Sequence, residues 1–365
     1  MAETRTRLLI AASGTGGHLF PAIAVAEQLT ETLPDASIEW LGVPDRLENQ
    51  LVPDRYPLHQ VRVEGFQTRF GLNTFKILGQ FVAAIFKTRQ LLQKGQFQAV
   101  FTTGGYIAAP AIIAAKTLGL PTILHESNAL PGKVTRFLSP WCTTVAVGFE
   151  AATHHLPRAQ TVCVGTPVRS QFLSASEPET HLPDLPIPPD VPVITIIGGS
   201  QGAVAVNRLI RQSAPAWFEA GIWVVHLTGE NDPEANSLHH PQYLVRPFYN
   251  QMAPLLRRTT LVVSRAGAGT LTELAIVGVP AIQIPYPFAA EDHQSYNAEV
   301  FVKAGAARMI RQEALRGDRL TQEVLILLKS PETLQEMGRH AKALAVPDSA
   351  ERLAKLVREL IKRKT

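Results

Sequence analysis

The feature that most constrains the fold of this sequence is a repeated unit. In each copy, a short apolar run ends in a glycine-rich turn and a helical pattern follows. The first copy joins the run 8–12 to the turn 13–18, and the second joins the run 193–197 to the turn 198–203. Short apolar runs also alternate with helical patterns elsewhere in the chain, which is typical of parallel sheets covered by helices. We therefore predict an α/β protein in which each half builds a parallel sheet.

The length of the chain agrees with two such domains. At 365 residues it is long for a single core, and an apolar content of 45% provides enough residues to bury two. A proline-rich stretch at 178–192 is typical of a linker or a surface excursion. The final stretch, 349–364, has the spacing of an amphipathic, basic helix that can pack back onto the first domain.

The composition argues against several classes of protein. Cys142 and Cys163 are too few for a disulfide framework, and their spacing fits no zinc motif. No apolar run approaches the ~20 residues of a membrane span, and the run 8–12 has the pattern of a strand rather than of a signal peptide. Basic residues are not interleaved with aromatic ones as in nucleic-acid-binding modules. We expect a cytoplasmic protein with no nucleic-acid partner, able to associate peripherally with a membrane.

The first glycine turn has features of a phosphate site. Glycines between a strand and a helix let backbone N–H groups approach a phosphate, and we expect the helix to begin around Pro21. The turn is not a dinucleotide fingerprint, because Leu19 stands where the third glycine is required. His18 can act there as a general base or as a charge partner. Two simpler interpretations stay open, namely a tight turn that binds nothing and an ordinary surface histidine.

The second half carries a matching turn and two further polar segments. Ser200 can donate its hydroxyl to a phosphate oxygen, and the helix after it should end before Pro215. After the predicted strand 261–264, small residues open another helix, in which Glu273 can accept hydrogen bonds from both ribose hydroxyls. An acid near a helix start is also common as a purely stabilising residue. A polar cluster at 291–298 follows the next strand, where α/β sheets place ligands.

The stretch 65–125 contains six basic residues and no acidic one, which would favour an anionic partner such as phosphate or a lipid surface. Within it, residues 74–94 have the apolar spacing of a helix. Two interpretations are open for this helix. It can pack on the sheet, which the spacing alone slightly favours, or it can present a membrane-facing patch with a basic rim.

A set of short motifs runs in order from the first predicted strand to the last predicted helix: 14–18 with 20–21, 104–106, 125–128, 167–169, 198–203, 266–273, and 293–294 with 297–298. Together they resemble the family of bacterial peptidoglycan glycosyltransferases that make lipid II. The resemblance implies a GT-B fold of two Rossmann-like domains facing across a cleft. These are an acceptor- and membrane-facing domain at 1–167 and a UDP-GlcNAc-binding domain at 168–346. The chain departs from the usual family residues at Ser13, Ser127 and Thr166.

The resemblance also implies which residues bind the substrates. Arg169 and Ser200 meet the donor's nucleotide and diphosphate, the backbone near Tyr249 meets uracil, and Gln294 meets the sugar hydroxyls. A six-residue turn meets phosphate and ribose: Ala268, Gly269, Thr270, Leu271, Thr272 and Glu273. Further donor contacts come from the N-terminal domain: Thr15, Gly16, Gly17 and Asn128. The acceptor side is lined by the three candidate catalytic residues: His18, Tyr106 and Glu126.

The implied reaction transfers GlcNAc from UDP-GlcNAc to the C4 hydroxyl of MurNAc in undecaprenyl-diphospho-MurNAc-pentapeptide (lipid I), giving lipid II and UDP with inversion. His18 is the first candidate for the base and Glu126 the second, while Arg169 and a helix N-terminus meet the charge of the departing UDP. The sequence has no Asp-x-Asp motif, and we expect no metal and no cofactor. The expected setting is the cytoplasmic face of the bacterial inner membrane, with an anionic lipid surface and other cell-wall synthesis proteins as partners.

Three alternative functions share parts of this sequence pattern. His18, Glu126 and Gln294 argue against a non-catalytic sensor of nucleotide sugars. An epimerase of the same fold would need acidic hydrolytic groups and would have no use for a lipid acceptor. A glycosyltransferase with another lipid or a natural product as acceptor is the closest rival. The acid-free stretch and the segment 104–106 favour the lipid diphosphate instead.

Overall fold

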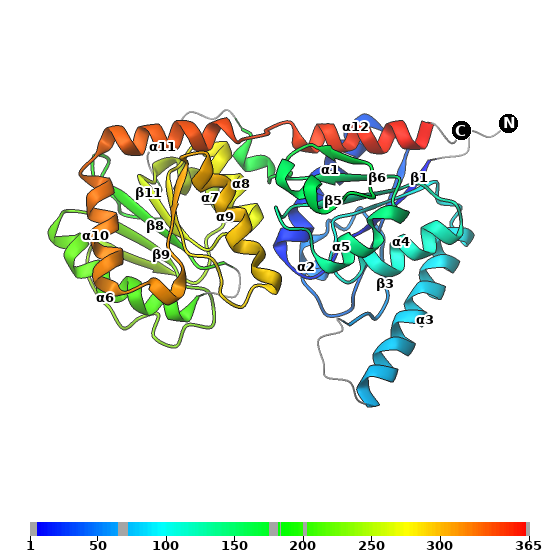
Figure 1. The fold of residues 1–365 in the computed structure, drawn as a ribbon, viewed down its shortest axis with the longest axis horizontal. Helices are drawn as coiled ribbons and strands as arrows, with labels where there is room; N and C mark the ends of the chain where they lie inside the picture. The colour runs from blue at the N-terminus through cyan, green and yellow to red at the C-terminus, as the bar shows by residue number, and fades with distance from the viewer. Residues whose placement is uncertain (1–5, 65–71, 175–181, 183, 200–202, 363–365) are drawn as a thin grey trace. The chain divides into compact units, whose positions relative to one another are not determined.

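The computed structural model describes residues 6–64, 72–174, 182, 184–199 and 203–362. The chain divides into two compact units, one made of 1–169 with 346–365 and the other of 170–345. Each unit has its own sheet (Figure 1), and every strand pairing in the described residues is parallel. The predicted α/β class is therefore confirmed.

The first unit is built on a seven-stranded sheet with the order β3-β2-β1-β4-β5-β6-β7. Its strands are β1 (Arg7–Ala11), β2 (Ser37–Gly42), β3 (Leu58–Gln60), β4 (Ala99–Thr102), β5 (Thr122–Glu126), β6 (Thr144–Val147) and β7 (Thr161–Cys163). The strand order reverses at β1, which pairs with β2 on one side and β4 on the other. The turns that leave β1 and β4 at their carboxyl ends are therefore neighbours, at the position where α/β sheets bind ligands.

Helices cover both faces of this sheet. They are α1 (Gly16–Thr32), α2 (Glu48–Leu51), α3 (Leu72–Lys94), α4 (Ala108–Thr117), α5 (Lys133–Leu138) and α12 (Ser349–Lys362), with the short 3-10 helices η1 (Ser139–Trp141) and η2 (Glu150–His155). Strand β1 is apolar on both sides, so Leu8 and Ile10 join a core with α1 and α12, while Leu9 and Ala11 join a second core with α3 and α4. The last helix of the chain thus packs against α1 in the first unit.

Helix α1 begins at Gly16, earlier than the expected start around Pro21. Pro21 lies inside the helix and has no N–H to donate to the carbonyl of Gly17. The helix continues through it because Leu19 and Ala22, on either side, are completely buried in the core. Tertiary packing outweighs the local preference here.

The second unit has a six-stranded sheet with the order β10-β9-β8-β11-β12-β13. Its strands are β8 (Val193–Ile197), β9 (Trp223–Leu227), β10 (Tyr243–Arg246), β11 (Leu261–Ser264), β12 (Ala281–Gln283) and β13 (Ala307–Met309). Its helices are α6 (Val204–Glu219), α7 (Met252–Arg258), α8 (Ala268–Val277), α9 (His293–Lys303), α10 (Gly317–Leu328) and α11 (Pro331–Ala343), with the 3-10 helices η3 (Ser170–Phe172), η4 (Ala290–Asp292) and η5 (Gln312–Ala314).

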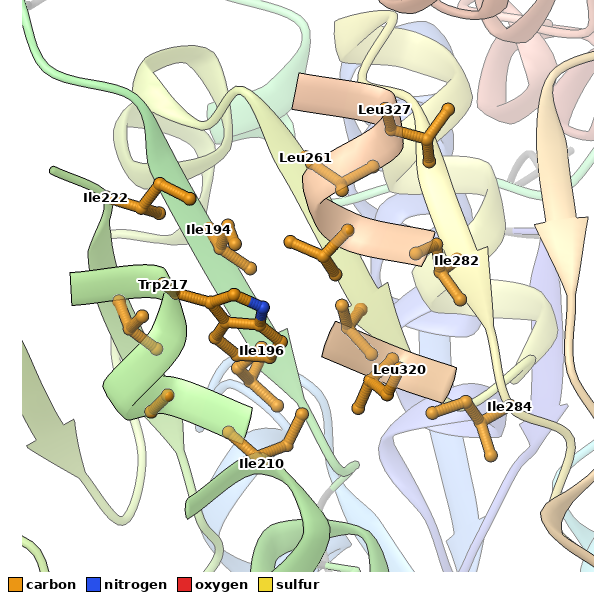
Figure 2. Close-up of a cluster of buried hydrophobic side chains, with 14 of the residues drawn as sticks. Ile194, Ile196, Ile210, Trp217, Ile222, Leu261, Ile282, Ile284, Leu320 and Leu327 are labelled. Carbon is orange, nitrogen blue, oxygen red and sulfur yellow. The ribbon is translucent and has the colours of Figure 1, made fainter. Parts of the chain in front are cut away.

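One apolar cluster fills the face of this sheet that α6 and α10 cover. Figure 2 shows Trp217 of α6 beside Ile194 and Ile196 of β8. The expectation that this helix ends before Pro215 is wrong, since α6 runs on to Glu219 with the proline inside it. The buried indole of Trp217 lies beyond the proline, and its burial offsets the one backbone hydrogen bond that Pro215 cannot make.

Candidate active site

The first glycine turn leaves the carboxyl end of β1 and is held by side chains from β2 and the segment after it. Trp40 Nε1 donates to the carbonyl of Ala12 at 2.8 Å. Glu48 is completely buried. It accepts from Ser13 Oγ at 2.5 Å and from the Gly14 N–H at 3.2 Å. Gly14 has a φ of 102°, which glycine adopts without strain, so these contacts and this residue together define the path of the turn.

His18 lies in the first turn of α1 and reaches across to the turn after β4. Its Nδ1 is 2.7 Å from the carbonyl oxygen of Thr103, whose Oγ1 donates back to the His18 carbonyl at 2.9 Å. Because a carbonyl oxygen only accepts, Nδ1 carries the proton and Nε2 is the basic nitrogen of the neutral ring. The ring lies against Gly104 and Gly105, where an added Cβ would come within 3.5 Å of it. Tyr106 follows and is 44% exposed.

The predicted donor contacts Thr15, Gly16 and Gly17 surround the start of α1. Thr15 is the residue before the helix, and Gly16 and Gly17 are its first two residues. N–H groups in a first helical turn have no partner within the helix, and the helix dipole makes them attractive to anions. The Phe20 ring packs on Gly16, and the guanidinium of Arg169 lies 5.0 Å from the centre of that ring. The structure therefore brings Arg169 to the same turn.

Glu126 ends β5 and organises the loop that follows. Its Oε1 accepts from the N–H and the Nδ2 of Asn128, both at 3.0 Å. Its Oε2 accepts from the Gly132 N–H at 3.1 Å and from Thr135 Oγ1 at 2.7 Å. These four donors engage both oxygens of the buried carboxylate. The geometry favours a role in positioning Asn128.

The second glycine turn joins β8 to α6. Gly199 has a φ of 91°, and Ser200 lies outside the described residues. Asn207, in the first turns of α6, donates to the Thr228 carbonyl at 2.9 Å and to Asp232 at 2.8 Å. The start of α6 is thereby tied to the loop after β9.

The turn that opens α8 presents fewer polar groups than its sequence indicates. Leu271 is buried, and its N–H bonds the carbonyl four residues earlier at 3.0 Å. The Thr272 hydroxyl donates to the Ala268 carbonyl at 2.9 Å. The remaining polar groups of this turn are the first-turn N–H groups at 268–270, the hydroxyl of Thr270 and the half-buried carboxylate of Glu273.

Gln294, at the start of α9, has a fixed side-chain orientation. Its Oε1 accepts from the N–H groups of Ala266 at 3.2 Å and Tyr286 at 2.9 Å. The completely buried Asn297 donates to the Ala266 carbonyl at 3.1 Å from the same helix. Because two backbone donors occupy the amide oxygen, the Nε2 of Gln294 is the end that can donate to a ligand.

Arg265 is a buried cation that the sequence-based prediction did not single out. Its Nη1 donates to the carbonyls of Ile284 and Pro285, each at 3.1 Å, and its Nη2 donates to Gln312 at 2.7 Å. Burial lowers the pKa of Arg265 to about 10, so it stays charged at neutral pH. It holds the end of β12, which leads to Gln294. A cation directly between a strand and a small-residue turn is a sequence signal that could have pointed to it.

Tyr249 is nearly buried, and its hydroxyl donates to Asp184 at 2.7 Å. Burial and the neighbouring carboxylate raise the pKa of this phenol. The contact predicted for uracil is with the backbone near Tyr249, and the hydrogen bond of the Tyr249 side chain to Asp184 would hold that backbone in place.

In the described part of the chain, no group of three or more His, Cys, Asp or Glu side chains could hold a metal ion.

Comparison with known proteins covers almost the whole chain. Residues 8–147 match the glycosyltransferase family 28 N-terminal domain, and residues 193–353 match the glycosyltransferase family 28 C-terminal domain. The chain belongs to glycosyltransferase family 28. The UDP-N-acetylglucosamine–N-acetylmuramyl-(pentapeptide) pyrophosphoryl-undecaprenol N-acetylglucosamine transferase of Trichormus variabilis is 64% identical over 100% of both chains. Its namesake in Nostoc punctiforme is 63% identical over 99% of both. The expected resemblance and the glycosyltransferase activity are confirmed.

Solved structures of glycosyltransferases share the fold. Acinetobacter baumannii MurG covers 97% of this chain and 99% of its own, with a TM-score of 0.79 and 29% identity. CalG4, the calicheamicin glycosyltransferase, covers 99% of both chains with a TM-score of 0.70 but only 15% identity, so it supports the fold alone. The predicted GT-B fold of two parallel-sheet domains is confirmed.

Within the first unit of this family 28 chain, the structure gathers His18, the start of α1 and Arg169 around one turn. Within the second, it gathers Gln294 and the loop that leads into α8. The supporting residues Glu48 and Thr103 were not predicted, and Asn297 was part of a predicted motif but was given no role. Thr103 acts through its main-chain oxygen and Glu48 comes from a short polar segment, so neither has a sequence signal. Asn297 had one, because it lies three residues after Gln294 on the same helix.

Proposed function

We propose that this glycosyltransferase transfers GlcNAc from UDP-GlcNAc to the C4 hydroxyl of the MurNAc unit of lipid I, releasing UDP and forming lipid II for peptidoglycan synthesis. The carrying observation is the 64% identity over the whole chain to an enzyme named for transfer of N-acetylglucosamine to N-acetylmuramyl-(pentapeptide) pyrophosphoryl-undecaprenol. Each glycine turn lies between a parallel strand and a helix, a position that suits the binding of phosphate by backbone N–H groups.

His18 is the proposed base. Its Nε2 takes the proton of the acceptor hydroxyl while that oxygen bonds to the anomeric carbon from the face opposite UDP. The bond between the anomeric carbon and the phosphate oxygen breaks, so UDP leaves with the electron pair and the configuration inverts. The 2.7 Å contact between Nδ1 and the Thr103 carbonyl supports this assignment, because it fixes the required tautomer and stabilises the imidazolium that forms.

The proposed donor contacts lie mainly on the second unit. The first-turn N–H groups of α8 and the carboxylate of Glu273 meet phosphate and ribose, and the Nε2 of Gln294 donates to a sugar hydroxyl. The backbone near Tyr249 meets uracil, and Arg169 with the start of α6 stabilises the charge of departing UDP. Asn128, held by Glu126, completes the donor site. Tyr106 is proposed to line the acceptor side.

Helix α3 is the proposed membrane-binding element. One side packs into the first unit through buried residues that include Ile77, Ala84 and Leu92. The other side exposes four large apolar side chains: Phe75, Leu78, Val82 and Phe86. The helix has no acidic residue, and no helix in the described residues is long and apolar enough to cross a bilayer. We propose peripheral binding to the anionic cytoplasmic face of the inner membrane, where other cell-wall synthesis proteins would be accessible.

The deciding experiment incubates the protein with UDP-GlcNAc and a short-chain lipid I analogue, with EDTA and without added metal. The expected products are UDP and the lipid-linked GlcNAc–MurNAc disaccharide, in equal amounts. A parallel reaction with a glycosylated natural product as acceptor tests the closest rival. Turnover of that acceptor without turnover of the lipid I analogue would overturn the proposal.

A further inference from the structure

We propose that Glu48 is a positioning residue of the reaction, because it fixes the first glycine turn and through it the place of His18. This inference rests on the proposed function, in which His18 accepts a proton. Glu48 is the first residue of the short helix α2, which follows β2. Its side chain is completely buried.

The carboxylate of Glu48 is surrounded by donors from two segments. Oε1 accepts from Ser13 Oγ at 2.5 Å and from the Val43 N–H at 2.7 Å. Oε2 accepts from the Gly14 N–H at 3.2 Å. Gly42 allows this placement, since a Cβ there would come within 2.8 Å of the Glu48 side chain. Glu48 thus connects the segment after β2 to the turn after β1.

These contacts fix one end of the glycine turn and a second set fixes the other, so the position of His18 depends on both. At the first end, the Ser13 hydroxyl and the Gly14 N–H point inward to Glu48, so these donors are not the ones that would meet a substrate. At the second end, His18 and Thr103 exchange two hydrogen bonds. Charge-assisted hydrogen bonds are stronger than neutral ones, so removing the carboxylate should release the first end while the sheet stays intact.

The primary test replaces Glu48 by Gln, whose amide nitrogen cannot accept from the Gly14 N–H. We expect kcat for the lipid I analogue to fall about tenfold or more at saturating substrates. Hydrogen exchange in residues 13–18 should accelerate. The matched control is Glu39→Gln. Glu39 is another buried carboxylate of the same unit, bonded to Arg7 and His59. This control should lower the melting temperature and leave kcat unchanged.

A second variant, Ser13→Ala, removes one donor and keeps the carboxylate. It should lower kcat several-fold with faster exchange at 13–18, and it decides the question if Glu48→Gln does not fold. A lower melting temperature with unchanged kcat and unchanged exchange in these variants would overturn the inference, since it would indicate a structural role only. If the wild-type protein makes no lipid II, the proposed function fails, whereas the exchange measurement still reports whether Glu48 fixes the turn.

Discussion

His18 makes its most informative contact with a main-chain oxygen. The Thr103 carbonyl sets the tautomer of the imidazole, and this cannot be changed by substituting the Thr103 side chain. The substitution that tests this site therefore removes the imidazole ring of His18 itself. His18→Ala should lower kcat by about 10²–10⁴-fold, the usual contribution of a general base. The measurement is UDP release at saturating substrates.

The matched control for this variant is His154→Ala, because His154 is an exposed histidine on η2 in the same unit. It should leave turnover unchanged. Near-normal turnover of His18→Ala would remove His18 from the mechanism and leave only a role in packing against Gly104 and Gly105.

A substitution at Gln294 can test the role of its Nε2 donor separately from that of its Oε1 acceptor. Gln294→Glu keeps an oxygen to accept from Ala266 and Tyr286 but replaces the Nε2 donor by a second acceptor. The expected result is a loss of about 10–100-fold in kcat/KM for UDP-GlcNAc, the equivalent of about 1.5–3 kcal/mol for a hydrogen bond. The melting temperature should change little. A wild-type kcat/KM would show that the Nε2 does not bind the sugar.

The candidate site was predictable from sequence where a residue type implied its own chemistry. His18 and Gln294 belong to this group. Glu48 could not be predicted, because its partners are a hydroxyl and a main-chain N–H that lie 35 and 34 residues away in sequence. Glu126 was predicted as a candidate base. Its role stays a prediction, and its four donors favour positioning.

Among the elements, the apolar runs predicted as strands at 8–12, 193–197 and 261–264 are confirmed as β1, β8 and β11, whereas three strands at sheet edges were not predicted. The central strands β1 and β8 are short buried apolar runs, which are visible in the sequence. The missed strands β3, β10 and β13 each end a sheet and are partly exposed. An edge strand buries less apolar surface than a central one, so its sequence is closer to that of a loop.

Helix α3 should bind an anionic membrane surface through its exposed apolar side. The protein should bind vesicles of phosphatidylglycerol mixed with phosphatidylcholine and bind less as salt is added, because anionic lipid attracts its basic residues. The double variant Phe75→Ser, Phe86→Ser should bind markedly less, since both rings are largely exposed, at 77% and 67%. Co-sedimentation measures this binding.

The matched control for α3 is Ile326→Ser, which removes an exposed apolar side chain from α10 in the second unit. Its binding should equal that of the wild type. Equal binding to pure phosphatidylcholine vesicles, or no binding at all, would contradict the electrostatic part of the proposal.

A buried ion pair joins α6 to the loop after β9. Burial alone would raise the pKa of Asp232, but hydrogen bonds from Arg211 and Asn207 outweigh it and lower the pKa below its usual value of 3.8. A lowered native pKa contributes stability above the unfolded pKa, and that stability is lost as the pH falls through the native value. Wild-type stability should therefore fall as the solution is acidified below about pH 4.

Asp232→Asn tests this linkage. It removes the buried carboxylate partner of Arg211 and leaves Glu234, at 3.1 Å, as the remaining ion-pair partner. The loss should cost about 1–3 kcal/mol at neutral pH, and the acid dependence of the melting temperature should become flatter. An acid dependence equal to that of the wild type would show that other carboxylates control acid unfolding.

In the whole molecule, the C-terminal end of the chain returns to the first unit, after the second unit has been formed by the residues between. The last helix, α12, completes the core of the first unit, where Leu353 is fully buried beside α1 residues. The second unit has a separate core that includes Leu327 of α10, also fully buried. Because neither core contains residues of the other unit, a cavity made in one should weaken that unit first.

Leu353→Ala and Leu327→Ala form a matched pair that tests this separation. Each truncation should cost about 2–5 kcal/mol through lost burial and a cavity. Native-state hydrogen exchange resolves where the loss appears. Leu353→Ala should accelerate exchange in 6–64 and 72–169, although the substitution lies near the C-terminus, and should leave 203–345 unchanged. Leu327→Ala should give the reverse pattern. Acceleration throughout the chain in both variants would mean that the two cores unfold as one cooperative unit.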